Sequence, residues 1–541
     1  MALGRLDDLA RSYFDLRWHL DPVGASQAGV TSHDGRLGRY GKDILTPHLA
    51  ALKALSGALE EATTDTLDEE IDRTALLNDV RVTVARFEKE KPQTKNPEFW
   101  ISHLLNGLHV LLARRDAAPD QRARALLERL EDVPAFLDEA RATVTNPVRV
   151  FCQTGRLMSA GGLLLVREAG AAASEAATDV TGDGDRLSAA VAGATAALES
   201  FSRDLDRWGD SAGEQFALGE DEFNFRLHYE HALRDTAPEL WRYGHHLKEE
   251  VEADIAARAA KLDAKRSWRD LIVHLRQNHP SAAELVPAYA NAMERARAFV
   301  AAKNLVALPA GGVEVKVTPD FLRPLIPFAA YDSPGAFSTD RTGSFYVTTP
   351  DPALSPAQQD RILSDHCRWE MSATALHEGY PGHHLQTMYA QAQASPVRKL
   401  VSTPLTQEGW ALYCEELMAE QGFYQTEEEL LFQRVHLLWR AMRVLLDVGL
   451  HTRGMTFEHA VDQLVDTFGV DRANAQAEVR RYCAWPAYQI CYAVGRRELL
   501  ALREDFKQAQ GGAYTVRRFH DAIVPYGGLP VSLIRWGLGL A

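Results

Sequence analysis

The sequence is poor in cysteine and has no paired cysteine motif. Its 541 residues include five cysteines, at positions 152, 367, 414, 483 and 491, and no two of them form a Cys-x-x-Cys pair. A disulfide framework or a cysteine-rich zinc site needs paired cysteines at short spacing. We therefore expect five buried free thiols, which are typical of proteins from a reducing compartment.

Long apolar runs are also missing. No uninterrupted stretch reaches the roughly 18 apolar residues that a membrane-spanning helix needs. Residues 1–20 carry a charge every few positions and lack the apolar core of a signal peptide. We therefore expect a cytoplasmic protein that has no membrane partner.

The chain has no excess of positive charge. Lys and Arg number 59 against 74 Asp and Glu, which gives a net charge of −15. Proteins that bind nucleic acid usually carry a basic patch, so we expect no nucleic-acid partner. Hydrophobic residues make up 46% and charged residues 25% of the chain. This usage is normal for a globular protein and is sufficient for a large core.

One short segment concentrates metal-ligand chemistry. Residues 375–386 read ALHEGYPGHHLQ and place three histidines and one glutamate around a Pro-Gly pair. Imidazole nitrogens suit Zn²⁺, and a carboxylate beside the first histidine can act as a general base toward water. The segment resembles the helical motif His-Glu-x-x-His, but its spacing is longer.

A straight helix cannot bring these histidines together. His383 follows His377 by six residues, which on an ideal helix means a rotation of about 240° and a rise of about 9 Å. His384 returns to the same face, but its rise of about 10.5 Å is too long for a shared ion. Pro381 must bend or end the helix, and Gly382 allows the chain to compress after it. We expect either His383 or His384 to meet His377; the alternative is a helix that ends in a turn with surface histidines.

A third protein ligand is expected on the next helix. Glu408 follows His383 by 25 residues, in the segment 405–420, which reads as a helix. This separation is typical of two antiparallel helices joined by a loop. Glu415 lies two turns further on the same helical face and is expected to orient a ligand histidine. The alternative for both glutamates is a solvated acidic helix face.

These motifs resemble a known bacterial family, called domain of unknown function 885. The residues that carry the resemblance are HEGYPGHHLQ at 377–386 and EGWALYCEEL at 408–417, with support from 439–451 and 480–495. The resemblance spans nearly the whole chain. It extends more distantly to the clan of zinc metallopeptidases that includes angiotensin-converting enzyme, thimet oligopeptidase and Taq-type carboxypeptidases.

The resemblance implies a mostly helical, peptidase-like metal site. It implies His377, His383 and Glu408 as ligands and Glu378 as the base, and it favours His383 over His384. The chain departs from the family at Tyr488, where glutamine commonly follows the proline.

A late segment, residues 480–496, is rich in tyrosine and arginine. A peptidase needs a second donor for the developing oxyanion, and we assign this role to Tyr492. Substrate binding is assigned to Arg481, Tyr488 and Arg496, because guanidinium groups can pair with a substrate carboxylate. The alternative is a tyrosine-rich core helix with arginines at its rim. Asp447 and His451 are spaced as an i, i+4 pair, for which a supporting role is expected.

The fold is predicted to be mainly α. Apolar residues recur at helical spacing over 121–142, 236–262 and 428–450, and further helices are expected at 187–205, 358–380 and 406–421. Residues 169–187 are expected to form a loose connection. Alternating residues within 305–350 predict a small mixed or antiparallel sheet near the metal. There, 343–349 is expected to hold substrate at a strand edge or to form a structural hairpin.

We expect one large metallopeptidase-like domain over residues 1–541 with a deep cleft. Residues 1–300 would form one wall of the cleft, and residues 301–541 would hold the metal site. The predicted function is hydrolysis of amide bonds in short peptides or small-molecule amides by metal-activated water, with zinc as cofactor; Mn²⁺, Co²⁺ or Fe²⁺ could serve instead. The alternatives are a metal enzyme of the same fold acting on a non-peptide metabolite, and a non-catalytic binding protein on a peptidase scaffold.

Overall fold

The structure is a computed structural model that describes residues 5–176, 184–319, 322–323, 326 and 328–540. It forms two compact units. Unit 1 comprises Met1–Phe216, Pro319–Pro327 and Pro334–Asp340, and unit 2 comprises Ala217–Thr318, Phe328–Ser333 and Arg341–Ala541. The expectation of one domain with a deep cleft stays a prediction.

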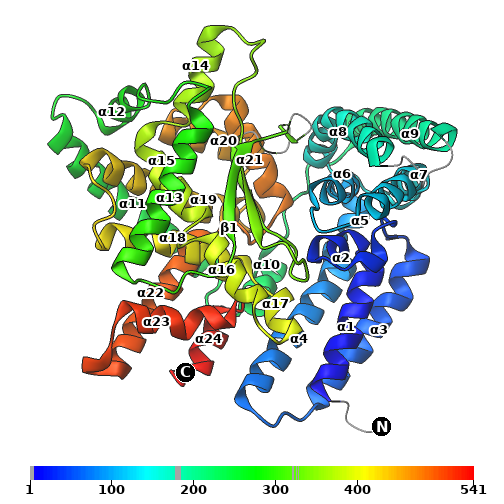
Figure 1. Ribbon diagram of the computed structural model, residues 1–541, viewed down its shortest axis with the longest axis horizontal. Helices are drawn as coiled ribbons and strands as arrows, with labels where there is room; N and C mark the ends of the chain where they lie inside the picture. The colour runs from blue at the N-terminus through cyan, green and yellow to red at the C-terminus, as the bar shows by residue number, and fades with distance from the viewer. Residues whose placement is uncertain (1–4, 177–183, 320–321, 324–325, 327, 541) are drawn as a thin grey trace. The chain divides into compact units, whose positions relative to one another are not determined.

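Unit 1 is helical and contains four helices, α6 to α9, that pack on one another. α6 packs on α7 and α8, and α9 packs on both α7 and α8 (Figure 1). The helices of this unit are α1 (Leu6–Leu20), α2 (Pro22–Ala28), α3 (Lys42–Glu61), α4 (Leu67–Ala85), α5 (Pro92–Lys95), α6 (Pro97–Ala113), α7 (Pro119–Thr143), α8 (Arg149–Ala176) and α9 (Gly184–Ser211).

Unit 2 contains the remaining long helices and the metal-ligand motifs. Its helices are α10 (Glu220–Tyr229), α11 (Ala237–Leu262), α12 (Trp268–Leu275), α13 (Leu285–Lys303), α14 (Pro356–Ser364), α15 (Arg368–Glu378), α16 (His383–Gln391), α17 (Pro396–Leu400), α18 (Pro404–Glu420), α19 (Glu427–Thr452), α20 (Phe457–Phe468), α21 (Arg472–Ala484), α22 (Cys491–Gln510), α23 (Val516–Ile523) and α24 (Val531–Gly537). α11 packs along α19, and α18 packs along α22. The prediction of a mainly α fold is confirmed.

A three-stranded sheet lies within unit 2, as predicted. Its strands are β1 (Gly312–Val317), β2 (Ala329–Asp332) and β3 (Thr342–Val347), in the order β1-β3-β2. β3 runs parallel to β1 and antiparallel to β2, and α13 packs against β1 (Figure 1). Because β3 is the middle strand, both of its edges are already paired. The expected role of 343–349 as a strand edge for substrate is therefore wrong.

The single helix expected over 358–380 is in fact two helices. α14 ends at Ser364 and α15 begins at Arg368. Between them His366 is buried, where its ring stacks on Phe328 at 4.1 Å between centroids and meets the Tyr289 hydroxyl at 3.1 Å. The backbone N–H of Arg368 donates to the carbonyl of Asn278 rather than continuing a helix. We attribute the break between α14 and α15 to the packing of buried His366.

Two further expectations can be compared with the structure. Residues 169–176 belong to α8 rather than to the loose connection expected over 169–187, and residues 177–183 lie outside the described part of the chain. All five cysteines are free and buried, as predicted. Among the described residues, no helix combines the length and the hydropathy needed to cross a bilayer.

Glu98 on α6 is a buried carboxyl group whose Oε2 has no hydrogen-bond partner among the described residues. Burial raises its pKa to about 8. Since this value lies above the ordinary 4.5, the native state loses stability relative to the unfolded chain as pH rises from about 4.5 to about 8.

We expect Glu98→Gln to raise the Tm relative to the unmodified protein in a pH-dependent way. The difference should be small at pH 5, grow through neutral pH and become constant above pH 8, because the amide never ionises. Thermal unfolding followed by circular dichroism measures it. A Tm difference that is the same at pH 5 and pH 9 would contradict this account.

Candidate metal centre

The chain bends sharply between the two histidines, as the sequence predicts. α15 ends one residue after His377, and α16 begins at His383. The bond between Tyr380 and Pro381 is cis. The N–H of Gly382 donates to the carbonyl of Leu376 at 3.0 Å, so the chain turns back onto the end of α15.

Gly382 is required at the bend for steric reasons. A Cβ at this position would lie 1.9 Å from the carbonyl oxygen of His377. Its φ of −72° lies outside the left-handed region, so φ alone does not require glycine. Glycine is required because the backbone at residue 382 packs directly against the backbone of His377. Any side chain at 382 would push His383 away from His377.

α18 both holds the bend and carries Glu408, the third candidate ligand. The indole Nε1–H of Trp410 donates to the carbonyl of Pro381 at 2.8 Å. The thiol of Cys414, one helical turn further on, contacts the same carbonyl at 3.6 Å. Glu408 lies two residues before Trp410 on the same helix. One helix therefore sets both the position of the bend and the position of the carboxylate.

His377, His383 and Glu408 converge as a candidate metal-ligand set. Each offers one ligand atom, and these atoms lie within 4.8 Å of one another. Oε2 of Glu408 is 3.7 Å from Nε2 of His377 and 3.2 Å from Nε2 of His383. Zinc bonds of about 2.0–2.2 Å in a tetrahedral site place neighbouring ligand atoms roughly 3.3–3.6 Å apart. The donor set therefore fits a zinc ion with little adjustment.

His384 does not join this set. Its Nδ1 lies 2.8 Å from the hydroxyl of Tyr331 on β2, and its ring packs on Tyr380. Burial lowers the pKa of His384 to about 4, so it is neutral at physiological pH. Of the two adjacent histidines, the structure places His383 beside His377 and Glu408.

Glu415 bonds the far side of the His377 ring, as the sequence predicts for an orienting carboxylate. Its Oε1 lies 2.8 Å from Nδ1 of His377, and both residues are buried. An Nδ1–H donated to Glu415 leaves Nε2 free to bind a metal. Burial alone would lower the pKa of His377, but the contacts with Glu408 and Glu415 raise it to about 9.

Tyr488 holds the second oxygen of the ligand carboxylate. Its hydroxyl donates to Oε1 of Glu408 at 2.6 Å, while Oε2 faces the two histidines. Burial and the charge of Glu408 keep the pKa of Tyr488 well above its ordinary value, so the phenol remains a donor. The sequence assigned Tyr488 to substrate binding, whereas the structure places its hydroxyl on Glu408, a candidate metal ligand.

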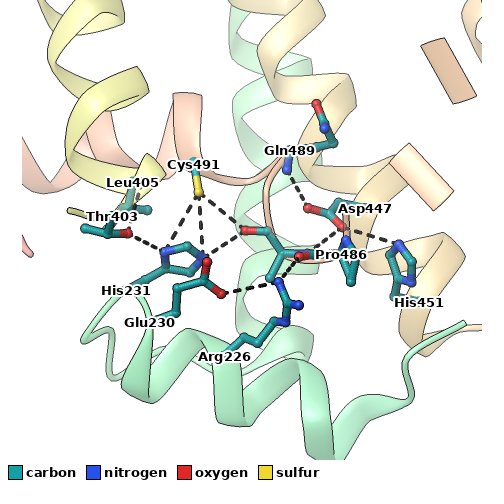
Figure 2. A network of polar contacts seen from close by, with 11 residues as sticks. Arg226, Glu230, His231, Thr403, Leu405, Asp447, His451, Pro486, Gln489 and Cys491 are labelled. Carbon is teal, nitrogen blue, oxygen red and sulfur yellow. Dashed lines mark hydrogen bonds and ion pairs between the residues drawn. The ribbon is translucent and has the colours of Figure 1, made fainter. Parts of the chain in front are cut away.

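The loop that carries Tyr488 is held by buried Asp447 (Figure 2). This carboxylate accepts the backbone N–H groups of Ala487, Gln489 and Ile490 at 3.0, 2.7 and 3.2 Å. Ala487 has a φ of +61°, a conformation that residues other than glycine rarely adopt. Three hydrogen bonds to one carboxylate maintain it, and they fix the direction in which Tyr488 points.

Side chains from distant parts of unit 2 complete the support of this loop (Figure 2). His231 contacts the carbonyl of Ala487 through Nε2 at 2.9 Å and the hydroxyl of Thr403 through Nδ1 at 2.6 Å. Arg226 donates to the carbonyl of Pro486 at 3.2 Å. His451 lies 3.9 Å from Asp447, at the spacing expected for the i, i+4 pair. Asp447 thus supports the loop directly, and His451 lies beside Asp447.

A close helix crossing brings α22 next to α18. A Cβ at Gly409 would lie 2.5 Å from the backbone of Gly495, and a Cβ at Gly495 would lie 2.0 Å from the carbonyl of Leu405. Two glycines at the contact therefore let the helices approach through their backbones. Because Gly409 follows Glu408 directly, this crossing positions the start of α22 beside the metal ligand.

Four other residues that the sequence singled out are Glu378, Tyr492, Arg481 and Arg496, and each has different neighbours in the structure. Glu378 ends α15 half-buried, and its charge contributes to the raised pKa values of His377 and Tyr331. The Tyr492 ring lies 6.2 Å from the Tyr488 ring. The two predicted substrate arginines are both paired with carboxylates of unit 2: Arg481 with Glu478 at 2.7 Å, and Arg496 with Glu416.

Apart from Asp447, the residues of a polar stripe along α19 were not predicted from the sequence. This buried helix places Gln433, His436, Arg440, Arg443 and Asp447 at spacings of three and four residues. His436 lies 3.3 Å from Glu370 and 3.9 Å from Glu415. Polar residues at helical spacing among the buried apolar residues of this helix could have indicated a polar network, because buried polar groups need partners.

Comparison with known proteins gives the family. Residues 22–537 match the family described as bacterial protein of unknown function (DUF885). The chain belongs to this family. A search of curated proteins finds no match.

Two solved structures share the fold of this DUF885 protein. One is a candidate lipoprotein of unknown function from Shewanella oneidensis, with 23% identity, a TM-score of 0.80, and coverage of 99% of this chain and 100% of that one. The other is a candidate lipoprotein from Colwellia psychrerythraea, with 17% identity, a TM-score of 0.85, and 99% coverage of both chains. At these identities the likeness shows the fold alone.

We expect Tyr488→Phe to weaken zinc binding by about 10- to 100-fold without unfolding the protein. Loss of the hydroxyl frees Oε1 of Glu408 and leaves a buried carboxylate oxygen without its donor, as when other groups that orient a ligand are removed. Competition with a chromophoric chelator measures the affinity.

Tyr413→Phe is the matched control, because it removes a buried hydroxyl that contacts His520 instead of a candidate ligand. Zinc affinity in this variant should stay within about threefold of the unmodified protein. Equal zinc affinities for Tyr488→Phe and Tyr413→Phe would show that the contact with Glu408 does not orient a ligand.

Proposed function

We propose that this DUF885 protein is a metal-dependent hydrolase that cleaves amide bonds of short peptides, with zinc as its cofactor. The observation that carries the proposal is the convergence of His377, His383 and Glu408, whose ligand atoms lie within 4.8 Å of one another. Two imidazoles and one carboxylate leave one tetrahedral position open, which is typical of catalytic rather than structural zinc. A bound zinc ion would supply Lewis-acid activation of water and of the substrate carbonyl.

Glu378 is the proposed general base. It follows a ligand directly in sequence and its charge acts on the neighbouring His377, yet it is absent from the set of converging ligand atoms. A carboxylate in this position can take a proton from the attacking water and pass it to the leaving amine.

Tyr492 is the proposed hydrogen-bond donor to the developing oxyanion. Burial, and then the nearby charge of Glu408, raises the pKa of Tyr492, so its phenol stays protonated at physiological pH. It lies at the start of α22, which the crossing of Gly409 and Gly495 holds against α18. A fixed donor of this kind stabilises negative charge that develops in the transition state.

We expect Glu378→Gln to retain zinc and to lose peptide hydrolysis by at least about 100-fold, because the amide cannot accept the proton from water. Mass spectrometry of a peptide library incubated with zinc-loaded protein measures turnover, and elemental analysis measures zinc.

Glu249→Gln is the control, since Glu249 is an exposed residue of α11 in the same unit. It should leave both hydrolysis and zinc unchanged. Retained hydrolysis in Glu378→Gln would refute the role of Glu378, and an absence of cleavage by the zinc-loaded unmodified protein would count against the peptidase assignment.

The two adjacent histidines give a second, independent test. We expect His383→Ala to reduce zinc content to below about one tenth of an equivalent, because two remaining ligands hold zinc weakly. His384→Ala should retain close to one equivalent, because this ring contacts Tyr331 instead of the ligand set. The reverse pattern would assign the ion to a different site.

A further inference from the structure

Three arginines gather beside Tyr492. Arg440 and Arg443 on α19 place their Cζ atoms 5.9 and 4.7 Å from the centre of the Tyr492 ring. Arg481 on α21 lies close enough for its charge to act on the same phenol. We call these three residues the arginine cluster.

Two arginines of the cluster share one carboxylate. Glu478 accepts from Nη2 of Arg443 at 3.1 Å and from Nη2 of Arg481 at 2.7 Å. The same carboxylate also accepts the hydroxyl of Tyr482 at 2.7 Å. One carboxylate therefore serves two guanidinium groups.

Arg440 has no carboxylate of its own. Its closest ion-pair contact is Nη2 to Oε1 of Glu415 at 3.8 Å, and this oxygen already bonds Nδ1 of His377 at 2.8 Å. Within the described part of the chain, its Nε is buried and has no hydrogen-bond partner. Arg440 thus keeps one buried N–H donor that no described residue accepts.

A guanidinium group with an unaccepted donor favours an anion from outside the chain. Guanidinium groups stay charged at any physiological pH, and a partly buried charge without a partner is unfavourable. The side chains remain partly accessible, with exposed fractions of 16% for Arg440, 10% for Arg443 and 35% for Arg481. Planar guanidinium groups match the two oxygens of a carboxylate.

The cluster is connected to the candidate metal centre through two tyrosines. Arg443 lies over Tyr492, the Tyr492 ring lies 6.2 Å from that of Tyr488, and the Tyr488 hydroxyl bonds Glu408 at 2.6 Å. An extended peptide advances at most about 3.6 Å per residue. An extended segment of a few residues beyond the scissile bond can therefore connect the candidate metal centre with the cluster.

We propose that the arginine cluster binds the free C-terminal carboxylate of the peptide substrate, so that the enzyme removes short fragments from the C-terminus. This inference rests on the proposed hydrolase function. Hydrolysis adds the hydroxyl of water to the acyl fragment and a proton to the new amine, and the departing fragment keeps the carboxylate that the arginines hold. Arg440 and Arg443 are the specificity residues, and Arg481 with Glu478 keeps Arg443 in place.

Binding to a turnover-deficient protein tests the cluster without requiring catalysis. Zinc-loaded Glu378→Gln protein is titrated in a calorimeter with tetra-alanine and with its C-terminal amide. We expect the free acid to bind about 10- to 100-fold more tightly, the usual effect of a hydrogen-bonded charge pair. Adding Arg440→Met or Arg443→Met should bring this preference to within about threefold, whereas Arg440→Lys should retain part of it.

Arg434→Met is the matched control on the same helix, because Arg434 pairs with Asp254 at 3.1 Å, away from Tyr492. It should keep the full preference for the free acid. Circular dichroism and zinc content establish that each variant is folded and loaded.

Equal affinities for tetra-alanine and its C-terminal amide would overturn the inference. A preference for the free acid that persists in both Arg440→Met and Arg443→Met would also overturn it. Tight binding of an amidated peptide with an internal glutamate would assign the cluster to acidic side chains and would also overturn the C-terminal assignment. If the unmodified protein cleaves no peptide, the proposed function fails, while this titration still decides whether the arginines bind a carboxylate.

Discussion

The close approach of Gly382 to the carbonyl of His377 is the constraint on which the candidate site depends. On a straight helix, His377 and His383 would face different directions, roughly 9 Å apart along the axis. The bend brings their rings to 4.8 Å between centroids. Trp410 holds the bend by bonding the carbonyl of Pro381, and the same helix supplies Glu408. A turn of only four residues thus brings the end of α15 and the start of α16 together, so that His377 and His383 lie side by side.

Unit 2 also buries several charged side chains. His377 lies between Glu408 and Glu415, and α19 places His436 and Arg440 within 4 Å of Glu415. Burying ions is unfavourable unless each finds a partner, so such a stripe in an otherwise apolar helix indicates a role other than stability. Asp447 shows one such role, since its hydrogen bonds direct Tyr488 toward the ligand carboxylate. For Arg440 and Arg443 of the same helix we propose a different role, the binding of a ligand carboxylate.

Much of this site could be predicted from the sequence because the decisive steps are local. The effect of Pro381 on a helix and the helical spacing of Glu408 and Glu415 follow from backbone geometry alone. The break between α14 and α15 could not be predicted, because it depends on His366 packing against Phe328 and Tyr289, which are distant in the chain. The position of Tyr488 on Glu408 depends on a loop conformation that Asp447 maintains from another helix, and the middle position of β3 depends on strand order. None of these features produces a periodic pattern in the sequence.

X-ray absorption at the zinc edge tests the central claim most directly. For the zinc-loaded protein the account predicts nitrogen and oxygen ligands at about 2.0–2.2 Å, with scattering from two imidazoles and no sulfur near 2.3 Å. His383→Ala supplied with excess zinc should show one imidazole fewer. A sulfur ligand, or an imidazole count that His383→Ala leaves unchanged, would contradict the claim that His377, His383 and Glu408 form one metal site.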